Sequence, residues 1–298
     1  MAKNNPVTTY LNSLAPSGRR AALSQLNMLR LAMEWDEPTV EQPFHCLTYA
    51  QIESLKGKML IEGKSYATIN HAIQVVKGVM KSAYLLERID HKTLMRIRSV
   101  SNLKGSTQEK GKALDKKMVD QLLRELETKT SWVGQRDLAI FAILLGTGVR
   151  RSELCSLNID DYCLESQAII VRHGKGNKAR CQFLPFWAAR AVELWLALRG
   201  YDPGSLFLRQ GAGIRRLSSD GLYRLVTRRT EDILGKRFTP HDMRRTYITQ
   251  LLNSGVDVLT VSKMAGHANV NTTQIYDRRD IEAQRRAAEA LMYHGGEQ

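Results

Sequence analysis

Cysteine is scarce in this sequence and never falls in a spacing that would carry chemistry. The four cysteines, Cys46, Cys155, Cys163 and Cys181, form no Cys-x-x-Cys pair, and no Cys and His spacing resembles a zinc site. A zinc centre of the usual spacing is therefore excluded. We expect the four residues to be buried free thiols of a protein in a reducing cytoplasm.

Long apolar runs are also missing. The longest, Leu138 to Leu145, is too short to cross a bilayer. The N-terminal stretch MAKNNPVTTYLNSL contains no apolar core of the kind that a secretory signal needs. These absences argue against membrane attachment, and we expect a cytoplasmic protein.

Negative charge is in short supply relative to positive charge. Lys and Arg number 44 against 30 Asp and Glu, so the formal net charge is +14 and the sequence pI is about 9.7. A chain this basic tends to meet a polyanion, and nucleic acid is the leading candidate. An anionic membrane surface comes second, and a basic soluble enzyme with neither partner remains open on charge alone.

The first hundred residues predict a compact helical bundle. The chain has 298 residues, of which 43% are apolar, enough for a sizeable core in one large or two ordinary domains. Ser65 is a plausible N-cap, and apolar residues recur after it at helical spacing from Ile69 to Leu86. Further helices are predicted over about 18–35 and 49–59, which together make a bundle over residues 1–101.

A polar, Lys- and Gly-rich stretch at 102–112 predicts an interdomain linker. We expect a second domain over 113–298, opening with a helix capped by Asp115 and continuing with a buried helix over 134–145. Strands over 168–173 and 180–184 flank the turn Gly174-Lys175-Gly176-Asn177-Lys178, which fits a hairpin. Helices follow at about 186–198, 219–234, 241–254 and 257–265, with Gly255 as a helix stop, and an amphipathic tail covers 281–293.

Four short segments of the second domain carry residues suited to phosphate chemistry. Each is weak alone: Arg150 is more often a surface charge or an ion pair with Glu153, and a hairpin lysine is usually solvated. An arginine guanidinium can nevertheless bind a phosphate bidentately, and His241 and Arg244 share a helix face near an N-terminus. The segments are TGVRRSEL with Arg150, GKGNK with Lys175, TPHDMRRTY with His241 and Arg244, and AGH with His267, followed nine residues later by Tyr276.

Taken in chain order, this set resembles the tyrosine recombinase (phage integrase) family from about Lys112 to the C-terminus. The resemblance implies a mainly α fold with a small antiparallel sheet, made of an N-terminal helical core-binding domain and a C-terminal α+β catalytic domain. It implies a site-specific recombinase that cleaves and rejoins DNA through a 3′-phosphotyrosyl intermediate and a Holliday junction. The tail at 281–293 would then exchange between subunits.

The resemblance also implies a role for each residue. Arg150 and Arg244 would clamp the non-bridging phosphate oxygens, with His267 as a further donor, and Tyr276 would attack. Lys175 would protonate the leaving 5′-oxygen, and His241 would help move the tyrosine proton. Glu153 would orient the pocket. No cluster of carboxylates suggests a two-metal site, so we expect neither metal, cofactor nor ATP to be needed.

Several alternatives remain open within and beyond this family. A chromosome-dimer recombinase of the Xer type and a phage, transposon or plasmid recombinase both fit. A type IB topoisomerase-like relaxase would use similar chemistry as a monomer, and a non-catalytic DNA-binding protein would have lost its site. For the recombinase we expect double-stranded DNA with paired inverted half-sites as the partner, a dimer on each site, a homotetramer in the synapse and association with the nucleoid.

Overall fold

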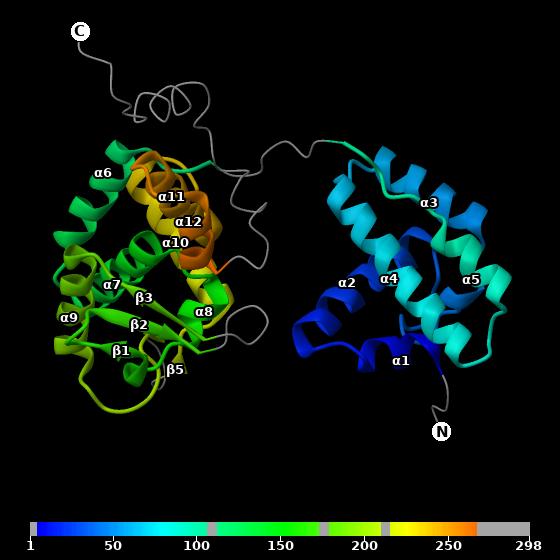
Figure 1. The fold of residues 1–298 in the computed structure, drawn as a ribbon, viewed down its shortest axis with the longest axis horizontal. Helices are drawn as coiled ribbons and strands as arrows, with labels where there is room; N and C mark the ends of the chain where they lie inside the picture. Colours follow the sequence, from blue (N-terminus) through cyan, green and yellow to red (C-terminus); the bar gives the residue numbers. More distant parts are fainter. Residues whose placement is uncertain (1–4, 106–111, 173–178, 210–214, 267–298) are drawn as a thin grey trace, which may run out of the picture. The chain divides into compact units, whose positions relative to one another are not determined.

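The computed structural model describes residues 5–105, 112–172, 179–209 and 215–266, and the chain divides into two compact units, residues 1–110 and 111–298 (Figure 1). Lys175, His267, Tyr276 and the tail at 281–293 lie outside the described residues. The fold is mainly helical with small antiparallel sheets, in agreement with the predicted class. No helix in the described ranges is long and apolar enough to cross a membrane.

The first unit is helical throughout its described part. It contains α1 (Pro6–Asn12), α2 (Pro16–Ala32), the 3-10 helix η1 (Phe44–Cys46), α3 (Tyr49–Ile61), α4 (Tyr66–Leu85) and α5 (His91–Arg98). Helix α4 packs against each of the other five. Ser65 caps α4 by accepting a hydrogen bond from the Thr68 amide at 3.2 Å, as the sequence predicts.

The chain remains attached to this unit beyond α5. Asn70 of α4 exchanges two hydrogen bonds with the backbone of Leu103, at 2.8 and 3.0 Å. Gln74 donates to the side chain of Asn102, and Leu103 packs against the apolar core of the unit. The first two residues of the polar stretch that composition assigns to the linker are therefore held by α4.

The second unit combines helices with two short sheets. Its helices are α6 (Lys116–Glu127), α7 (Trp132–Thr147), α8 (Arg151–Ser156), the 3-10 helix η2 (Ile159–Asp161), α9 (Phe186–Arg199), α10 (Ser219–Leu234), α11 (Pro240–Asn253) and α12 (Val258–Ala265). Strands β1 (Tyr162–Cys163), β2 (Ala168–Val171) and β3 (Arg180–Phe183) form an antiparallel sheet in that order, with Val171 opposite Arg180. Strands β4 (Leu208–Arg209) and β5 (Arg215–Arg216) form a second one.

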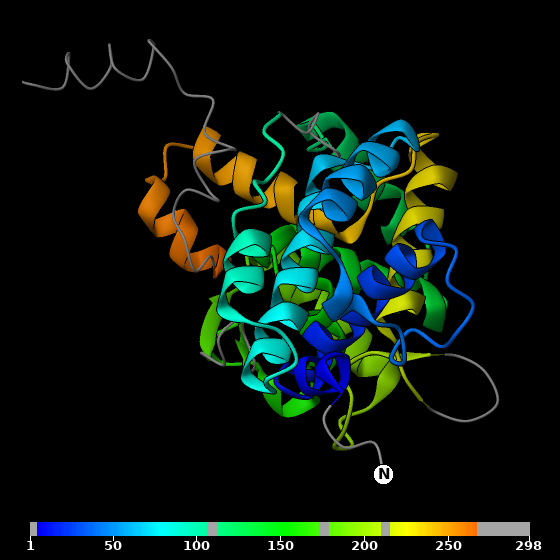
Figure 2. The same cartoon turned by 90° about the vertical axis from the view of Figure 1, so that its right-hand side faces the viewer.

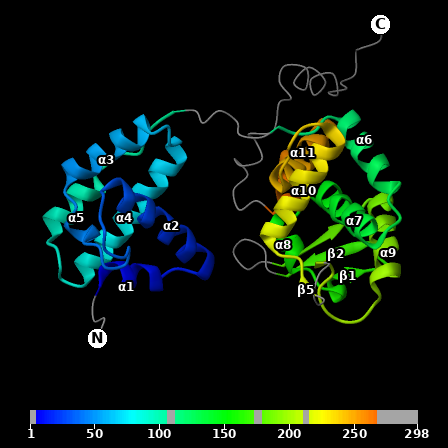
Figure 3. The same cartoon turned by 180° about the vertical axis from the view of Figure 1, so that it is seen from behind.

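Helix α7 is the centre of this unit because it is apolar on nearly every side. Its residues from Gly134 to Thr147 are all buried, and it packs against α6, α9 and α11 (Figures 1 and 3). Asp115 caps α6, as predicted, by accepting from the Met118 amide at 2.8 Å. The sequence therefore predicted both the existence and the burial of α7, although its ends extend two residues further each way.

Helices α11 and α12 share a small core of their own. Tyr247, Ile248 and Leu252 of α11 pack against Val261 and Ala265 of α12, and the two helices lie side by side (Figures 1 and 2). Met243, near the start of α11, belongs instead to the main core. Helix α11 thus connects the main core to α12 and fixes where α12 ends.

The cysteine prediction is wrong in one respect. All four cysteines are free thiols, but Cys46 and Cys181 are exposed and Cys155 and Cys163 are only partly buried. Cys181 is exposed because strand side chains alternate, and its neighbour Gln182 takes the buried position on β3. Partial burial raises the pKa of the Cys155 thiol to about 11.

Candidate active site

Arg150 stands where α7 ends and α8 begins. Gly148 stops α7 with φ +61°, and its amide bonds to the Leu144 carbonyl. Arg150 is then the N-cap of α8, and its side chain donates to Glu153 Oε1 at 2.8 Å and to the Gly266 carbonyl at 2.6 Å. The ion pair with Glu153 that the sequence offered as the ordinary interpretation is present, together with a second contact to the end of α12.

Arg244 is buried inside the unit, with 3% of its surface exposed. Its guanidinium donates to the Gly148 carbonyl and to the Ala265 carbonyl, both at 2.6 Å. These carbonyls lie at the C-terminal ends of α7 and α12, where the helix dipole favours a cation. Arg244 is therefore not a solvated surface charge.

The two arginines thus meet at one place, the C-terminal end of α12. Ala265 accepts from Arg244, and the next residue, Gly266, accepts from Arg150. His267 follows Gly266 directly in the sequence. Of the predicted site residues that the structure describes, it brings together Arg150, Glu153 and Arg244.

A third arginine, Arg180, joins this group although the sequence analysis did not select it. It lies at the start of β3 and donates to both oxygens of Glu153, from Nη1 to Oε1 at 3.0 Å and from Nη2 to Oε2 at 2.7 Å. Its signal in the sequence is faint, because it is one basic residue among 44. Period-two alternation in the strand RCQF would have placed Arg180 on the same face as the buried Gln182.

Glu153 is the buried carboxylate of this group, with 3% of its side chain exposed. Burial by itself would raise its pKa, but hydrogen bonds from Arg180 and from the Arg150 amide and side chain outweigh it and hold the pKa at about 2. Glu153 is therefore ionised at neutral pH. It neutralises one of the two positive charges that it contacts, so this corner of the unit keeps an excess of positive charge.

His241 lies in the first turn of α11, one turn before Arg244. Desolvation and the positive charges of Arg245 and Arg244 lower the pKa of His241 below its usual range, although its side chain remains accessible to solvent. The neighbouring Asp242 is occupied as a helix cap, bonded to the amide and hydroxyl of Thr239 at 2.8 and 2.7 Å. A neutral His241 near pH 7 is suited to accepting a proton.

Tyr247 is a tyrosine close to the arginines, but its environment is that of a packing residue. It is 6% exposed, and burial raises the pKa of its hydroxyl to about 12. A side chain at Gly148 would come within 2.3 Å of its ring. Tyr247 therefore packs tightly against the turn that precedes Arg150.

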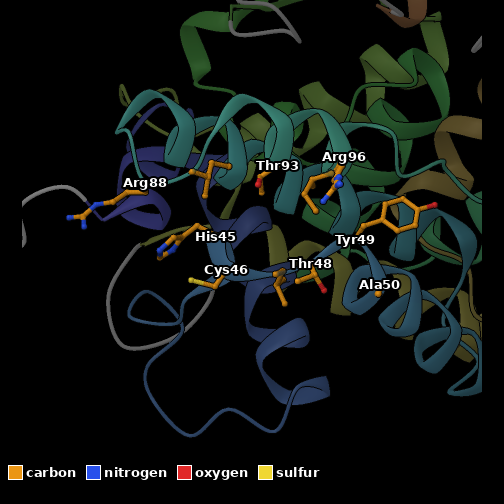
Figure 4. A pocket seen from close by; sticks show the side chains of 11 residues that line it. His45, Cys46, Thr48, Tyr49, Ala50, Arg88, Thr93 and Arg96 are labelled. Atoms are coloured by element: carbon orange, nitrogen blue, oxygen red, sulfur yellow. The ribbon is translucent and has the colours of Figure 1, made fainter.

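The first unit contains a groove-like cavity of about 700 Å³ between η1, the start of α3 and α5 (Figure 4). Its lining includes His45, Cys46, Thr48, Arg88 and Arg96. None of the predicted catalytic residues lies in this unit. The candidate active site is therefore the arginine group of the second unit, formed by Arg150, Arg180 and Arg244 around Glu153 and the end of α12.

The comparison with known families concerns mainly the second unit. The model of the phage integrase family matches residues 112–282, more than half of the chain and the whole segment from α6 through the arginine group. The chain belongs to the phage integrase family of tyrosine recombinases. It is 30% identical over 284 residues to tyrosine recombinase XerC of Alcanivorax borkumensis, covering 93% of this chain and 90% of that protein.

A second relative and a solved structure also resemble this integrase-family chain. Tyrosine recombinase XerA of Thermococcus onnurineus is 33% identical over 178 residues, 60% of this chain and 63% of that protein, slightly less than two thirds of its length. Among solved structures, the Tn1549 transposon integrase in complex with a circular intermediate DNA superposes with a TM-score of 0.72 at 21% identity, over 97% of this chain and all of that one. The comparisons support site-specific recombination and favour neither a relaxase nor a non-catalytic protein.

Proposed function

We propose that this tyrosine recombinase cuts one DNA strand at a specific site with Tyr276 and later rejoins it to a partner strand. The observation that carries the proposal is the convergence of Arg150 and Arg244 on the carbonyls of Ala265 and Gly266, directly before His267 in the sequence. A buried arginine and a partly exposed one, held by helix ends, make a preorganised site for a phosphodiester.

The arginines would act on the charge that develops during the attack. When the Tyr276 oxygen bonds to phosphorus, negative charge gathers on the two non-bridging oxygens. Arg150, with 27% of its side chain exposed, has more N–H donors than its contacts to Glu153 and Gly266 use. Fixed cations in a partly desolvated site stabilise the transition state without reorganising, and such electrostatic stabilisation usually contributes more to the rate than any other effect.

Two proton transfers complete the step. As the bond from Tyr276 to phosphorus forms, the tyrosine proton passes toward His241, whose lowered pKa leaves the imidazole neutral. As the bond from phosphorus to the 5′-oxygen breaks, Lys175 supplies the proton to that oxygen. The products are a 3′-phosphotyrosyl link and a free 5′-hydroxyl, with His267 as a further donor to the phosphate.

The reaction runs backwards by the same route. The phosphotyrosyl bond retains the free energy of the broken phosphodiester, so attack by a 5′-hydroxyl reseals the strand without a nucleotide triphosphate. If the attacking hydroxyl comes from a second duplex, strands are exchanged and a Holliday junction results. We propose that neither a metal nor a cofactor takes part.

The test is covalent capture on a nicked duplex. The binding site is first recovered by selecting a random duplex library with the full chain. A nick placed shortly after the cleavage position then lets the short fragment that carries the free 5′-hydroxyl diffuse away, so that rejoining is prevented. We expect the wild-type chain to accumulate a protein–DNA adduct that survives denaturing gel electrophoresis. Tyr276→Phe should form none, because the nucleophilic oxygen is gone.

Tyr247→Phe is the matched control, since it removes the hydroxyl of a tyrosine assigned to packing. It should form the adduct at nearly the wild-type rate. An adduct with Tyr276→Phe, or its loss with Tyr247→Phe only, would show that Tyr276 is not the nucleophile.

Double-stranded DNA is the proposed partner of this chain. The Tn1549 integrase was solved in complex with DNA, and we propose that this chain binds double-stranded DNA at paired inverted half-sites, one dimer on each site and a homotetramer in the synapse. Residues 1–101 would serve as the core-binding domain, and the tail at 281–293 would dock on a neighbouring subunit. Footprinting of the selected site together with crosslinking tests this; an active complex that stays monomeric would favour the relaxase alternative.

A further inference from the structure

Arg180 and Arg150 bind the same carboxylate from two different elements of the second unit. Arg150 precedes α8, and Arg180 begins β3, yet both contact Glu153 Oε1, at 2.8 and 3.0 Å. Glu153 Oε2 accepts from the Arg150 amide at 2.8 Å and from Arg180 Nη2 at 2.7 Å. The carboxylate is therefore a bridge whose two oxygens are both shared between the two arginines.

The bridge is largely buried. Glu153 is 3% exposed and Arg180 13% exposed, while Arg150 is 27% exposed. Loss of one partner would leave the charge of the buried carboxylate partly uncompensated and would destabilise the folded state, so folding favours keeping both contacts. Arg180 donates two parallel hydrogen bonds end-on to the Glu153 carboxylate, a geometry that fixes the plane of the carboxylate as well as its position.

The backbone at the end of α12 closes the arrangement. A side-chain carbon at Gly266 would lie 3.0 Å from Cζ and Nε of Arg180, so the guanidinium packs directly on this glycine. The carbonyl of the same residue accepts from Arg150 Nη2 at 2.6 Å. Arg180 is thus held between Glu153 and Gly266, the same two residues that hold Arg150.

We propose that Arg180 is a positioning residue for DNA cleavage: it acts through Glu153 to hold the Arg150 guanidinium in the orientation that receives the phosphate. Arg180 itself need not touch the DNA. This inference deepens the proposed function and rests on it, because it takes Arg150 as a phosphate-binding residue.

The central variant is Arg180→Lys, which keeps the positive charge and removes the two-pronged grip on Glu153. We expect the rate of adduct formation on the nicked duplex to fall roughly 10- to 100-fold, since small misplacements of a catalytic group have effects of this size. The Kd for the same duplex should change by less than about threefold, because the lysine preserves the charge that governs phosphate attraction.

A second bridge in the same unit provides the matched control. Asp137, which is fully buried, is shared by Arg136 and by Arg229, with contacts of 2.7 Å to each. Arg229→Lys therefore makes the same chemical change in the same kind of buried bridge, away from the predicted site residues. It should lower the melting temperature about as much as Arg180→Lys while leaving the cleavage rate within about threefold of wild type.

A double-mutant cycle tests whether Arg180 acts through Glu153. In a Glu153→Gln background the bridge is already weakened, so adding Arg180→Lys should reduce the cleavage rate by less than about threefold further. Full multiplication of the two single effects would overturn the proposal and give Arg180 an independent role at the DNA.

A measurement without DNA separates this inference from the proposed function. Nitrogen-15 relaxation of the Arg150 side chain, in the full-length protein, reports how firmly its guanidinium is held. We expect the Arg150 signal to become more mobile in Arg180→Lys and to stay unchanged in Arg229→Lys. Unchanged mobility in Arg180→Lys would overturn the inference whether or not the wild type cleaves DNA, whereas failure of wild-type cleavage with the expected mobility change would overturn only the proposed function.

Discussion

Gly148 is the residue on which the geometry of Arg150 and Arg244 depends most directly. Its φ of +61° is a conformation that a side chain disfavours, and its carbonyl accepts from Arg244. A Cβ there would lie 2.3 Å from the ring of Tyr247, which is buried and cannot move aside freely. The position therefore tolerates only glycine for two independent reasons.

Gly148→Ala should accordingly destabilise the second unit by roughly 2–5 kcal/mol, the sum of backbone strain and overpacking. Cleavage should fall even at temperatures where the unit stays folded, because Arg244 follows the displaced carbonyl. The measurement is urea unfolding alongside adduct formation.

Gly235→Ala is the control, since Gly235 also ends a helix with φ +66° but a side-chain carbon placed there would meet nothing within 4 Å. Gly235→Ala should lower the free energy of unfolding by only about 1–2 kcal/mol, the backbone strain alone, and should leave the cleavage rate at the wild-type value. Equal effects of the two substitutions would show that the contact with Tyr247 contributes nothing.

Glu153 makes stability depend on pH in a defined window. Its pKa is lowered from 4.5 to about 2 in the folded protein, so its contribution is fully present above pH 4.5 and disappears as the pH falls toward 2. The magnitude is roughly 3 kcal/mol for a shift of this size. We expect Glu153→Gln to lack this part of the acid sensitivity.

Urea unfolding at pH 7 and pH 3 provides the measurement. The difference in unfolding free energy between wild type and Glu153→Gln should shrink markedly at the lower pH. A difference that is the same at both pH values would mean that the Glu153 carboxylate gains nothing from Arg150 and Arg180 in the folded state.

At the scale of elements, α12 matters because its last carbonyls hold both arginines while its own core is small. Leu252 of α11 is fully buried in the cluster that joins α11 to α12. Leu252→Ala should leave a cavity and destabilise this contact by about 2–5 kcal/mol. We expect the amide hydrogens of α12 to exchange faster while those of the rest of the unit keep their exchange rates. The cleavage rate should fall severalfold under the same conditions.

Leu222→Ala is the comparison, because Leu222 is equally buried in the main core through α10. It should lower the melting temperature of the whole unit without selectively increasing exchange in α12. If both variants increased amide exchange in α12 by the same amount, α12 would unfold only together with the rest of the unit.

At the scale of the whole molecule, the two units have separate cores. One cluster is built from residues between Val7 and Val100 and the other from residues between Leu114 and Met243. Each cluster is made of residues of its own unit, so we expect a destabilising change in one core to act first on the unit that contains it.

Val76→Ala and Val226→Ala remove the same atoms from the two cores, at positions that are 2% and 0% exposed. Each should lower the unfolding free energy of its own unit by roughly 1–3 kcal/mol and leave the other unit unchanged. Scanning calorimetry with hydrogen exchange provides the measurement. A single transition that shifts equally in both variants would contradict independent cores.

The sequence alone determined the main helices and the family to which the chain belongs. Apolar periodicity and caps such as Ser65 and Asp115 are local, so they predicted α4, α6 and α7 closely. The order of Arg150, Lys175, His241, Arg244, His267 and Tyr276 indicated the family that the comparisons then showed. Short elements such as α1, α5 and β4 were missed, since they have too few residues to show a period.

Only the tertiary structure decided which cations meet. Arg150, Arg180 and Arg244 come from three separated stretches. The motifs of the sequence selected Arg150 and Arg244, but none of them selected Arg180. They converge because α7, β3 and α11 bring them to Glu153 and to the end of α12. The physical reason is that a buried carboxylate and helix-end carbonyls need donors, and which donors reach them depends on long-range packing that sequence spacing does not contain.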